Sequence, residues 1–490
     1  MKRLSYKNGI LLGLIGLSIV LTSQLLYDRK YSVSNLITFE DESVEKKIKD
    51  IDKYLNPQSF SISFGGGFHT VLFSDIAGVW SNSKDIVKNN YINPDEEFKK
   101  INYDEWEDVF KERSIKVNMP FVLENNLVSQ YLSLANNEGE KGISFDQLII
   151  PISGQFIYYG DTSSGEFYKK VLSADLSYIN GFVDNIEGQK NTRYQTVESY
   201  FSLEKILETE DFTENITLIP VSRYKGIPRI KAIREVDIAG TDFETDAKNI
   251  ANKAFGKNFD FVKKMEDYDG SLVYVYGYGE KALRIGANGS VEYTEKIGED
   301  YSGSDISHEE RIKIALETIS KYGDMPSNVY LSDYKMLEAE GQNVYLIEFD
   351  YKINDVDVVN SVKPEKSPIT VRIYKDRVIN FNKNIRKYVK TIAPIGSKDE
   401  VIKLPFDILN TNFKDISLKF NKNNREKLAN FEFDNYSFLL LQNIEKIRQC
   451  YFVDIFEGEE TIRNAWEIKI GVNTFYFDMF TGELLTDVVE

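Results

Sequence analysis

An uncharged segment of twenty residues near the N-terminus constrains this chain more than any other feature. It covers residues 8–27 (NGILLGLIGLSIVLTSQLLY) and follows Lys2, Arg3 and Lys7. Twenty helical residues at ~1.5 Å each span the ~30 Å hydrocarbon core of a bilayer. Because basic residues mark the cytoplasmic end, we expect a single-pass anchor with the bulk of the chain outside the cell membrane. A cleaved signal peptide is the alternative, but the segment lacks an Ala-x-Ala-like cleavage site.

Small residues form a stripe along this segment and suggest a packing face. The face comprises five residues on one side of the helix: Gly9, Gly13, Gly16, Val20 and Ser23. Small side chains let a second transmembrane helix approach closely, and van der Waals packing then drives association in lipid. The alternative is that glycine and serine are simply common in membrane helices.

The rest of the chain has the composition of a folded, acidic protein. Apolar residues make up 42% of the sequence and aromatic residues 13%. Beyond residue 27, 57 basic side chains face 77 acidic ones, a formal charge of −20. Such a body does not bind nucleic acid through phosphate neutralisation. Cys450 is the only cysteine, so no intramolecular disulfide forms, and we expect it to be a small buried residue.

Alternating helical and strand-like patterns predict an α+β fold with antiparallel sheets. Three β-hairpins are expected in the second half, each preceded by a helix. The hairpins are at 282–293, 370–381 and 474–485, and the helices at 244–254, 308–321 and 399–409. Earlier helices are expected at 94–113 and 124–135, with strands at 115–122, 147–152, 155–159 and 167–173. This succession suggests a weak internal repeat, with chance similarity between hairpins as the alternative.

Residues that carry catalytic chemistry are scarce. The two histidines are His69, expected on a strand facing solvent, and His308, expected in a helix start capped by Ser307. The glycines at 65–67 lack the Lys-Ser/Thr ending of a phosphate loop, so a sheet bulge or a close backbone contact is expected there. The sequence Asp267-Tyr-Asp269-Gly270 is expected to be a turn. We therefore predict no catalytic, cofactor-binding or metal-binding residue, although a carboxylate pair among 77 acids stays open.

Several stretches together resemble the YycH family of membrane-anchored extracytoplasmic regulators. They are IKVNMPFVL (115–123), FDQLIIPISGQFIYY (145–159), LVYVYGYGEKALRIGANGSVEYTEK (272–296), the segment 344–383, and AWEIKIGVNTFYFDMFTGELL (465–485). The last stretch also resembles the terminal hairpin of PepSY-type domains. The resemblance runs through nearly the whole chain and rests on packing and turn patterns rather than on a catalytic signature.

The resemblance implies a non-enzymatic regulator of the sensor histidine kinase that controls cell-wall metabolism in Gram-positive bacteria. Its expected partners are a kinase of the YycG (WalK) type and a YycI-like sister regulator. The expected division is an anchor at 1–30, an N-terminal α+β domain at 31–300, a middle domain at 301–395, and a C-terminal PepSY- or YycI-like domain at 396–490. The alternative function is an anchored surface hydrolase or cell-wall polymer-binding protein.

The packing face leads to a test of the anchor's partner. Replacing Gly13 by Leu places a bulky side chain where two helix backbones would approach, which should cost ~1–2 kcal/mol and weaken association about tenfold. Leu14→Ile, about 100° away around the helix, should have a much smaller effect. A bacterial membrane two-hybrid assay with the sensor kinase of the same organism measures both. Equal signals from both variants and the parent would exclude packing through this face.

Overall fold

The structure, a computed structural model, describes most of the compact unit Asp52–Glu490. The described ranges are 54–75, 78–93, 95–125, 127–128, 142–172, 174–202, 215–222, 227–235, 243–286, 288–298, 301–326, 328–339, 342–361, 366–393, 401–423, 436–456 and 459–489. The expected anchor at 8–27, with its packing face, and most of the expected helix at 124–135 lie outside these ranges. Within them, every helix is too short or too polar to cross a membrane.

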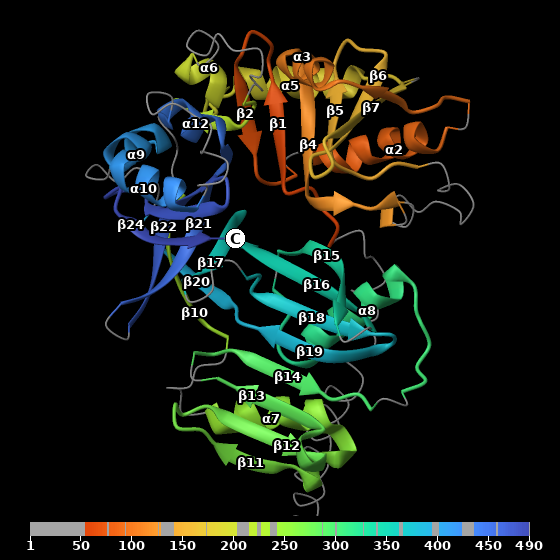
Figure 1. Ribbon diagram of the computed structural model, residues 1–490, viewed down its shortest axis with the longest axis vertical. Helices are drawn as coiled ribbons and strands as arrows, with labels where there is room; N and C mark the ends of the chain where they lie inside the picture. The colour runs from red at the N-terminus through yellow and green to blue at the C-terminus, as the bar shows by residue number, and fades with distance from the viewer. Residues whose placement is uncertain are drawn as a thin grey trace, which may run out of the picture. The chain divides into compact units, whose positions relative to one another are not determined.

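The N-terminal part is built on a nine-stranded sheet of described strands in the order β3-β7-β6-β5-β4-β1-β2-β8-β9 (Figure 1). Its strands are β1 Ser59–Ser63, β2 His69–Leu72, β3 Lys99–Ile101, β4 Ser114–Leu123, β5 Phe145–Pro151, β6 Phe156–Asp161, β7 Glu166–Val171, β8 Tyr194–Thr196 and β9 Leu218–Pro220. Its helices are α2 Val79–Ile92, α3 Tyr103–Lys111, α5 Ser177–Gly188 and α6 Val197–Phe201.

Helices α2 and α3 cover opposite faces of this sheet. Consecutive strand residues point to opposite faces, and Tyr158 and Tyr159 are consecutive in β6. Tyr159 donates a hydrogen bond to Asn90 of α2 over 2.8 Å, whereas Tyr158 belongs to the core cluster of α3 residues Trp106 and Phe110. The sheet is therefore the middle layer of three.

The remaining described strands form a larger sheet in the order β11-β12-β13-β14-β19-β18-β16-β17-β21-β22-β23-β24, with β15 beside β16. They are β11 Lys263–Glu266, β12 Leu272–Tyr276, β13 Lys281–Ile285, β14 Val291–Glu295, β15 Val329–Ala339, β16 Gln342–Ile353, β17 Val356–Asn360, β18 Ile369–Tyr374, β19 Arg377–Lys383, β21 Ile444–Phe456, β22 Glu459–Ile470, β23 Asn473–Asp478 and β24 Leu484–Val489. A separate two-stranded ribbon pairs β10 Arg229–Arg234 with β20 Arg386–Ala393.

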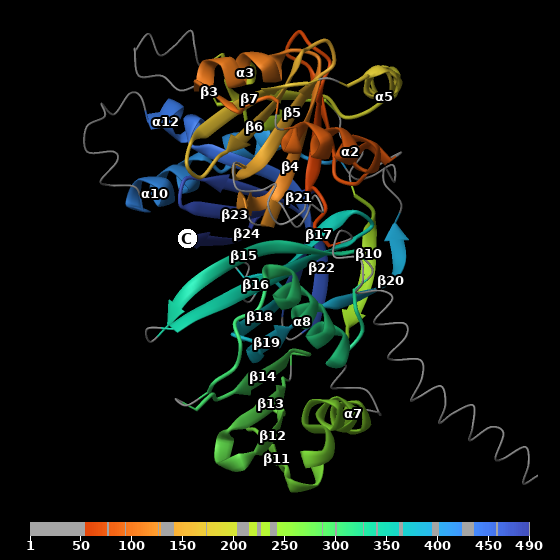
Figure 2. The same cartoon turned by 90° about the vertical axis from the view of Figure 1, so that its right-hand side faces the viewer.

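Helices pack on this larger sheet in separate groups. Helix α8 His308–Lys321 contacts β18 and β19, and α7 Phe243–Phe255 contacts β13, on the same side of the strands in Figure 2. Helix α10 Phe413–Asn423 contacts β23, with α9 Pro405–Thr411 and α12 Tyr436–Gln442 beside it. The fold is thus mixed α+β and rich in sheet, as expected from the sequence.

The second-half hairpins are confirmed as β13–β14, β18–β19 and β23–β24. Helix α8 begins where predicted, because Ser307 and Glu310 form a capping box that satisfies N–H groups at the helix start. Strand β14 pairs with β19, so the sheet continues across residue 300. The division of the chain into domains at 30, 300 and 395 stays a prediction.

Three local predictions were wrong. The helix expected at 94–113 starts only at Tyr103, with Asn102 accepting a hydrogen bond from the Glu105 N–H, and β3 precedes it. The glycines at 65–67 form neither a bulge nor a close contact. They connect β1 to β2 with φ of 79°, 64° and 80°, and an added Cβ would meet nothing within 4 Å. In the helix expected at 399–409, the described residues from 401 become helical only at Pro405, a favoured first helical residue.

Candidate functional site

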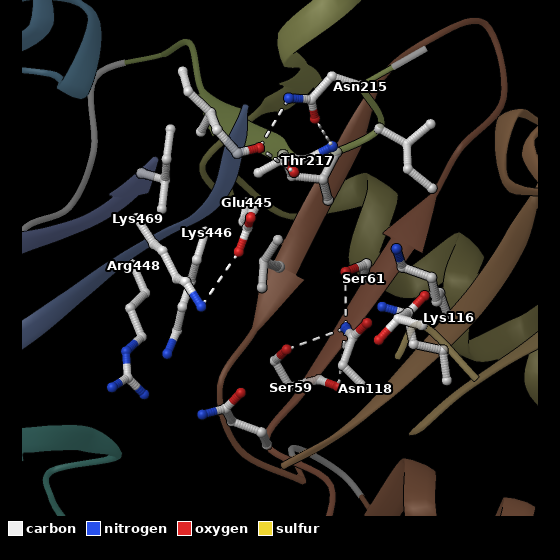
Figure 3. Close-up of a pocket in the computed structure, with 18 of the residues that line it drawn as sticks. Ser59, Ser61, Lys116, Asn118, Asn215, Thr217, Glu445, Lys446, Arg448 and Lys469 are labelled. Atoms are coloured by element: carbon white, nitrogen blue, oxygen red, sulfur yellow. Dashed lines mark hydrogen bonds and ion pairs between the residues drawn. The ribbon is translucent and has the colours of Figure 1, made fainter. Parts of the chain in front are cut away.

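A cavity of about 1180 Å³ lies between the N-terminal sheet and the C-terminal strands (Figure 3). Strands β1 and β4 form one wall of the cavity, and β21 and β22 form the facing wall. Asn215 and Thr217, which come just before β9 in the sequence, lie at one end. Labelled residues of the first wall are Ser59, Ser61, Lys116 and Asn118, and those of the second are Glu445, Lys446, Arg448 and Lys469.

The first wall is polar because of how β1 and β4 alternate. In β1 the residues Phe60 and Ile62 point to the apolar side of the sheet, so the serines between them point to the other side. In β4 the apolar residues Ile115 and Val117 do the same, which places Lys116 beside Ser61 across the strand pair. Helix α3 covers only part of this polar face, and the cavity lies against the remainder.

Asn215 joins the two walls. Its side-chain amide donates hydrogen bonds to the backbone carbonyls of Leu441, Gln442 and Ile444 over 3.1, 2.9 and 2.8 Å. The first two carbonyls are at the C-terminal end of α12, where helix carbonyls lack partners within the helix. Thr217 adds a hydroxyl hydrogen bond to Ile444 over 3.0 Å. These bonds fix the start of β21 against the edge of the N-terminal sheet.

The cations of the second wall are all engaged in ion pairs. Arg448 binds Glu467 and Asp357 over 2.7 and 2.6 Å, and Lys446 binds Glu467 over 3.0 Å. Lys469 pairs with Glu445 over 3.3 Å. Burial disfavours a charged Glu467, yet Arg448 and Lys446 lower its pKa to about 2. This wall is a neutralised network, with Glu467 held as a charged acceptor.

Lys116 differs from these cations. Only 6% of its surface is exposed, and among the described residues no carboxylate lies within ion-pair distance of its Nζ. Its Nζ lies 4.2 Å from the centre of the Phe110 ring, a cation–π contact. Burial lowers the pKa of Lys116 to about 8, and Asp146 opposes this only in part. The cavity therefore contains a buried cation whose charge no ion pair of the described chain compensates.

The expectation that His69 faces solvent was wrong. Its side chain is 1% exposed and stacks on Phe110 at 4.8 Å between ring centres. Burial, together with the charge of Lys116, lowers the pKa of His69 to about 4, so its ring is neutral at pH 7. A second cavity of about 500 Å³ adjoins it, lined also by Thr196 and Glu198. His69 lies on the polar face of the sheet, the same face as Val71, which is two residues further along β2 and lines the main cavity.

The other residues considered from the sequence have structural roles. His308 is in the first turn of α8, where its Nδ1 lies 2.7 Å from the Tyr334 hydroxyl. Cys450 is fully buried, as predicted, and burial raises the pKa of its thiol. Asp267 and Gly270 form the expected turn, with the Gly270 N–H donating to the Asp267 carbonyl. In the part of the chain that the structure describes, no three acidic, histidine or cysteine side chains gather as metal ligands.

The uncompensated charge of Lys116 predicts a stability change. Its ordinary pKa of 10.5 falls to about 8 on folding. Below pH 8 the side chain is charged in the folded protein, and the full cost of burying that charge is subtracted from the free energy of unfolding. This cost disappears as pH rises from 8 through 10.5, because the unfolded chain alone then holds the proton. Lys116→Met should raise the free energy of unfolding at pH 7 by ~1–3 kcal/mol in denaturant titrations.

The advantage of Lys116→Met should shrink toward pH 10.5. Lys99→Met is the matched control, because Lys99 is exposed on the edge strand β3 and should leave stability almost unchanged. A loss of stability in Lys116→Met at pH 7 would mean that Lys116 is compensated after all.

Comparison with known proteins gives one solved structure of the same fold. No protein-family model matches the chain, and no curated protein matches it in sequence. The crystal structure of YycH from Bacillus subtilis is similar at a TM-score of 0.50 and 11% identity, covering 89% of this chain and 96% of that one. The resemblance read from the sequence is thereby confirmed at the level of the fold: the chain has a YycH-like fold over most of its length.

Proposed function

We propose that this protein is a non-enzymatic, membrane-anchored extracellular regulator of the sensor histidine kinase that controls cell-wall metabolism. The observation that carries the proposal is the YycH-like fold across 89% of the chain. The expected anchor at 8–27 supports it, since that segment would hold the folded body at the outer surface of the membrane. The partners in this proposal are a YycG-type (WalK) kinase and a YycI-like regulator.

The chemistry of the main cavity supports a binding role rather than catalysis. Its lining includes no histidine or cysteine among the described residues. Its carboxylates Glu445 and Asp357 are both tied to cations of the same wall. Nucleophilic catalysis needs a nucleophile with a base in hydrogen-bond reach, and His69 stacks against Phe110 with no partner found for its Nδ1 among the described groups.

The alternative of a surface hydrolase rests on paired carboxylates in a cleft. Such enzymes need one carboxyl group as an acid and a second as a base or nucleophile, both facing substrate. Glu467 and Asp357 are two neighbouring carboxylates, but the Arg448 guanidinium forms an ion pair with each of them. Neither carboxylate is therefore free to act as an acid, a base or a nucleophile. This arrangement disfavours the hydrolase and leaves a polymer-binding role as the weaker alternative.

Regulation through contacts requires that the protein bind two states of the kinase with different affinity. We infer that the anchor packs beside the kinase helices through Gly9, Gly13 and Gly16, while the folded body contacts the extracellular part of the kinase. Both contacts then bias the same equilibrium. A coupling free energy of ~1–3 kcal/mol would change the ratio of the two kinase states about five- to 150-fold.

Reconstitution tests this proposal. The full-length chain and the kinase of the same organism are inserted into proteoliposomes, and kinase autophosphorylation is followed after addition of ATP. We expect the rate to change when this protein is present, because the ratio of active to inactive kinase shifts. Vesicles containing an unrelated single-pass protein at equal density are the control. An unchanged kinase rate, together with release of soluble sugars from purified wall polymer, would instead favour the hydrolase.

A further inference from the structure

The ammonium of Lys116 is an unusual group to which kinase regulation assigns no role. Lysine is almost never fully buried in proteins unless it is paired. Lys116 is more than nine-tenths buried and lines the main cavity. We propose that this cavity binds a small hydroxyl-bearing oxyanion, a sugar acid or a sugar phosphate, with the Lys116 ammonium as its counter-charge.

The neighbours of Lys116 supply that counter-charge only in part. The field of the Asp146 carboxylate of β5 reaches Lys116, but the two form no ion pair, and the Asp146 oxygens instead accept hydrogen bonds from the N–H and hydroxyl of Thr162 over 2.9 and 2.5 Å. His69 of β2 is neutral at pH 7, and helix α3 contributes the uncharged ring of Phe110. A bound anion would provide the missing partner.

The opposite wall adds no net charge to the cavity. Its three lining cations, Lys446, Arg448 and Lys469, are paired with the carboxylates of Asp357, Glu445 and Glu467. Lys116 is therefore the cation of the described lining that has no ion pair, so we expect the anion to bind at its wall.

Neutral polar groups indicate the rest of the ligand. Ser59, Ser61 and Asn118 lie on the same sheet face as Lys116, where the Asn118 amide donates to both serine hydroxyls over 3.2 Å. Those hydroxyls retain their own protons to donate. Gln147 lies beside Asn118 in the strand register and also lines the cavity. Hydroxyl and amide groups next to a single ammonium match a polyol that carries one oxyanion.

The size and apolar surface of the cavity agree with this class. About 1180 Å³ slightly exceeds the ~300–1,000 Å³ usual for small-molecule pockets, so a saccharide with ordered water fits. The half-buried rings of Tyr103 and Phe73 also line it. The C–H-rich faces of a sugar ring pack against aromatic rings, while its hydroxyls reach the serines and amides. Ligand binding is measured on the purified protein alone, so a failure to bind would leave kinase regulation untouched.

Calorimetric titration of the full-length chain in mild detergent tests the proposal at pH 8. The probes are glucose 6-phosphate, glucuronate, inorganic phosphate and neutral glucose. We expect at least one of the two sugar anions to bind at least tenfold more tightly than both glucose and inorganic phosphate. The tighter sugar anion identifies whether the oxyanion is a phosphate or a carboxylate.

Variants identify the residue responsible. Lys116→Met should weaken binding of the preferred sugar anion at least tenfold, Lys116→Arg should retain most of it, and Lys99→Met should bind as the parent does. Titrations in buffers of different ionisation enthalpy should show uptake of about half a proton at pH 8 by the parent, because an anion returns Lys116 to its charged form. Lys116→Met should show none.

Two results would overturn the inference. The first is that neither sugar anion binds better than glucose. The second is that Lys116→Met, shown by its melting curve to be folded, binds the sugar anion as tightly as the parent.

Discussion

The amide of Asn215 makes the contact on which the enclosure of the cavity depends. It donates to three backbone carbonyls at the end of α12 and the start of β21, and its oxygen accepts the Thr217 N–H over 2.9 Å. The residue is 8% exposed, and leaving such carbonyls buried without donors costs ~1–3 kcal/mol each. Together with the Thr217 hydroxyl on Ile444, this side chain therefore holds the edge of one sheet against the beginning of a strand in the other.

That contact, together with α3, which covers part of the same face, helps to bury a polar sheet face. Strands β1 and β4 alternate like the strands of a sheet with one solvated face, yet Ser61 and Lys116 are 4% and 6% exposed. Lys352 adds a second link, because its ammonium donates to the carbonyls of Gln58 and Phe73 over 3.0 and 2.8 Å. A ligand that contacts both walls of the cavity would stabilise the arrangement in which they face each other, and a bound molecule could thereby influence how the protein contacts a partner.

Local patterns predicted much of the second half of the sequence and little of the site. Helix α8 follows from the capping sequence at Ser307, and its neighbouring hairpins follow from turn residues such as Asn288-Gly289. These features depend on residues close in sequence. The burial of Lys116 depends instead on how α3 packs on the sheet, where the Phe110 ring lies 4.2 Å from its ammonium, and alternation indicates which residues share a face without indicating what covers it. The same reason accounts for the error at His69.

The protonation of Lys116 is the most direct measure of this account, because both the stability cost and the proposed ligand depend on it. The pKa can be measured by NMR titration of protein labelled at the lysine Cε carbon, with Lys116→Arg used to assign the signal. The account predicts a midpoint near pH 8 in the ligand-free protein. A midpoint at or above the ordinary value of about 10.4 would show that the charge is fully compensated and would contradict the account.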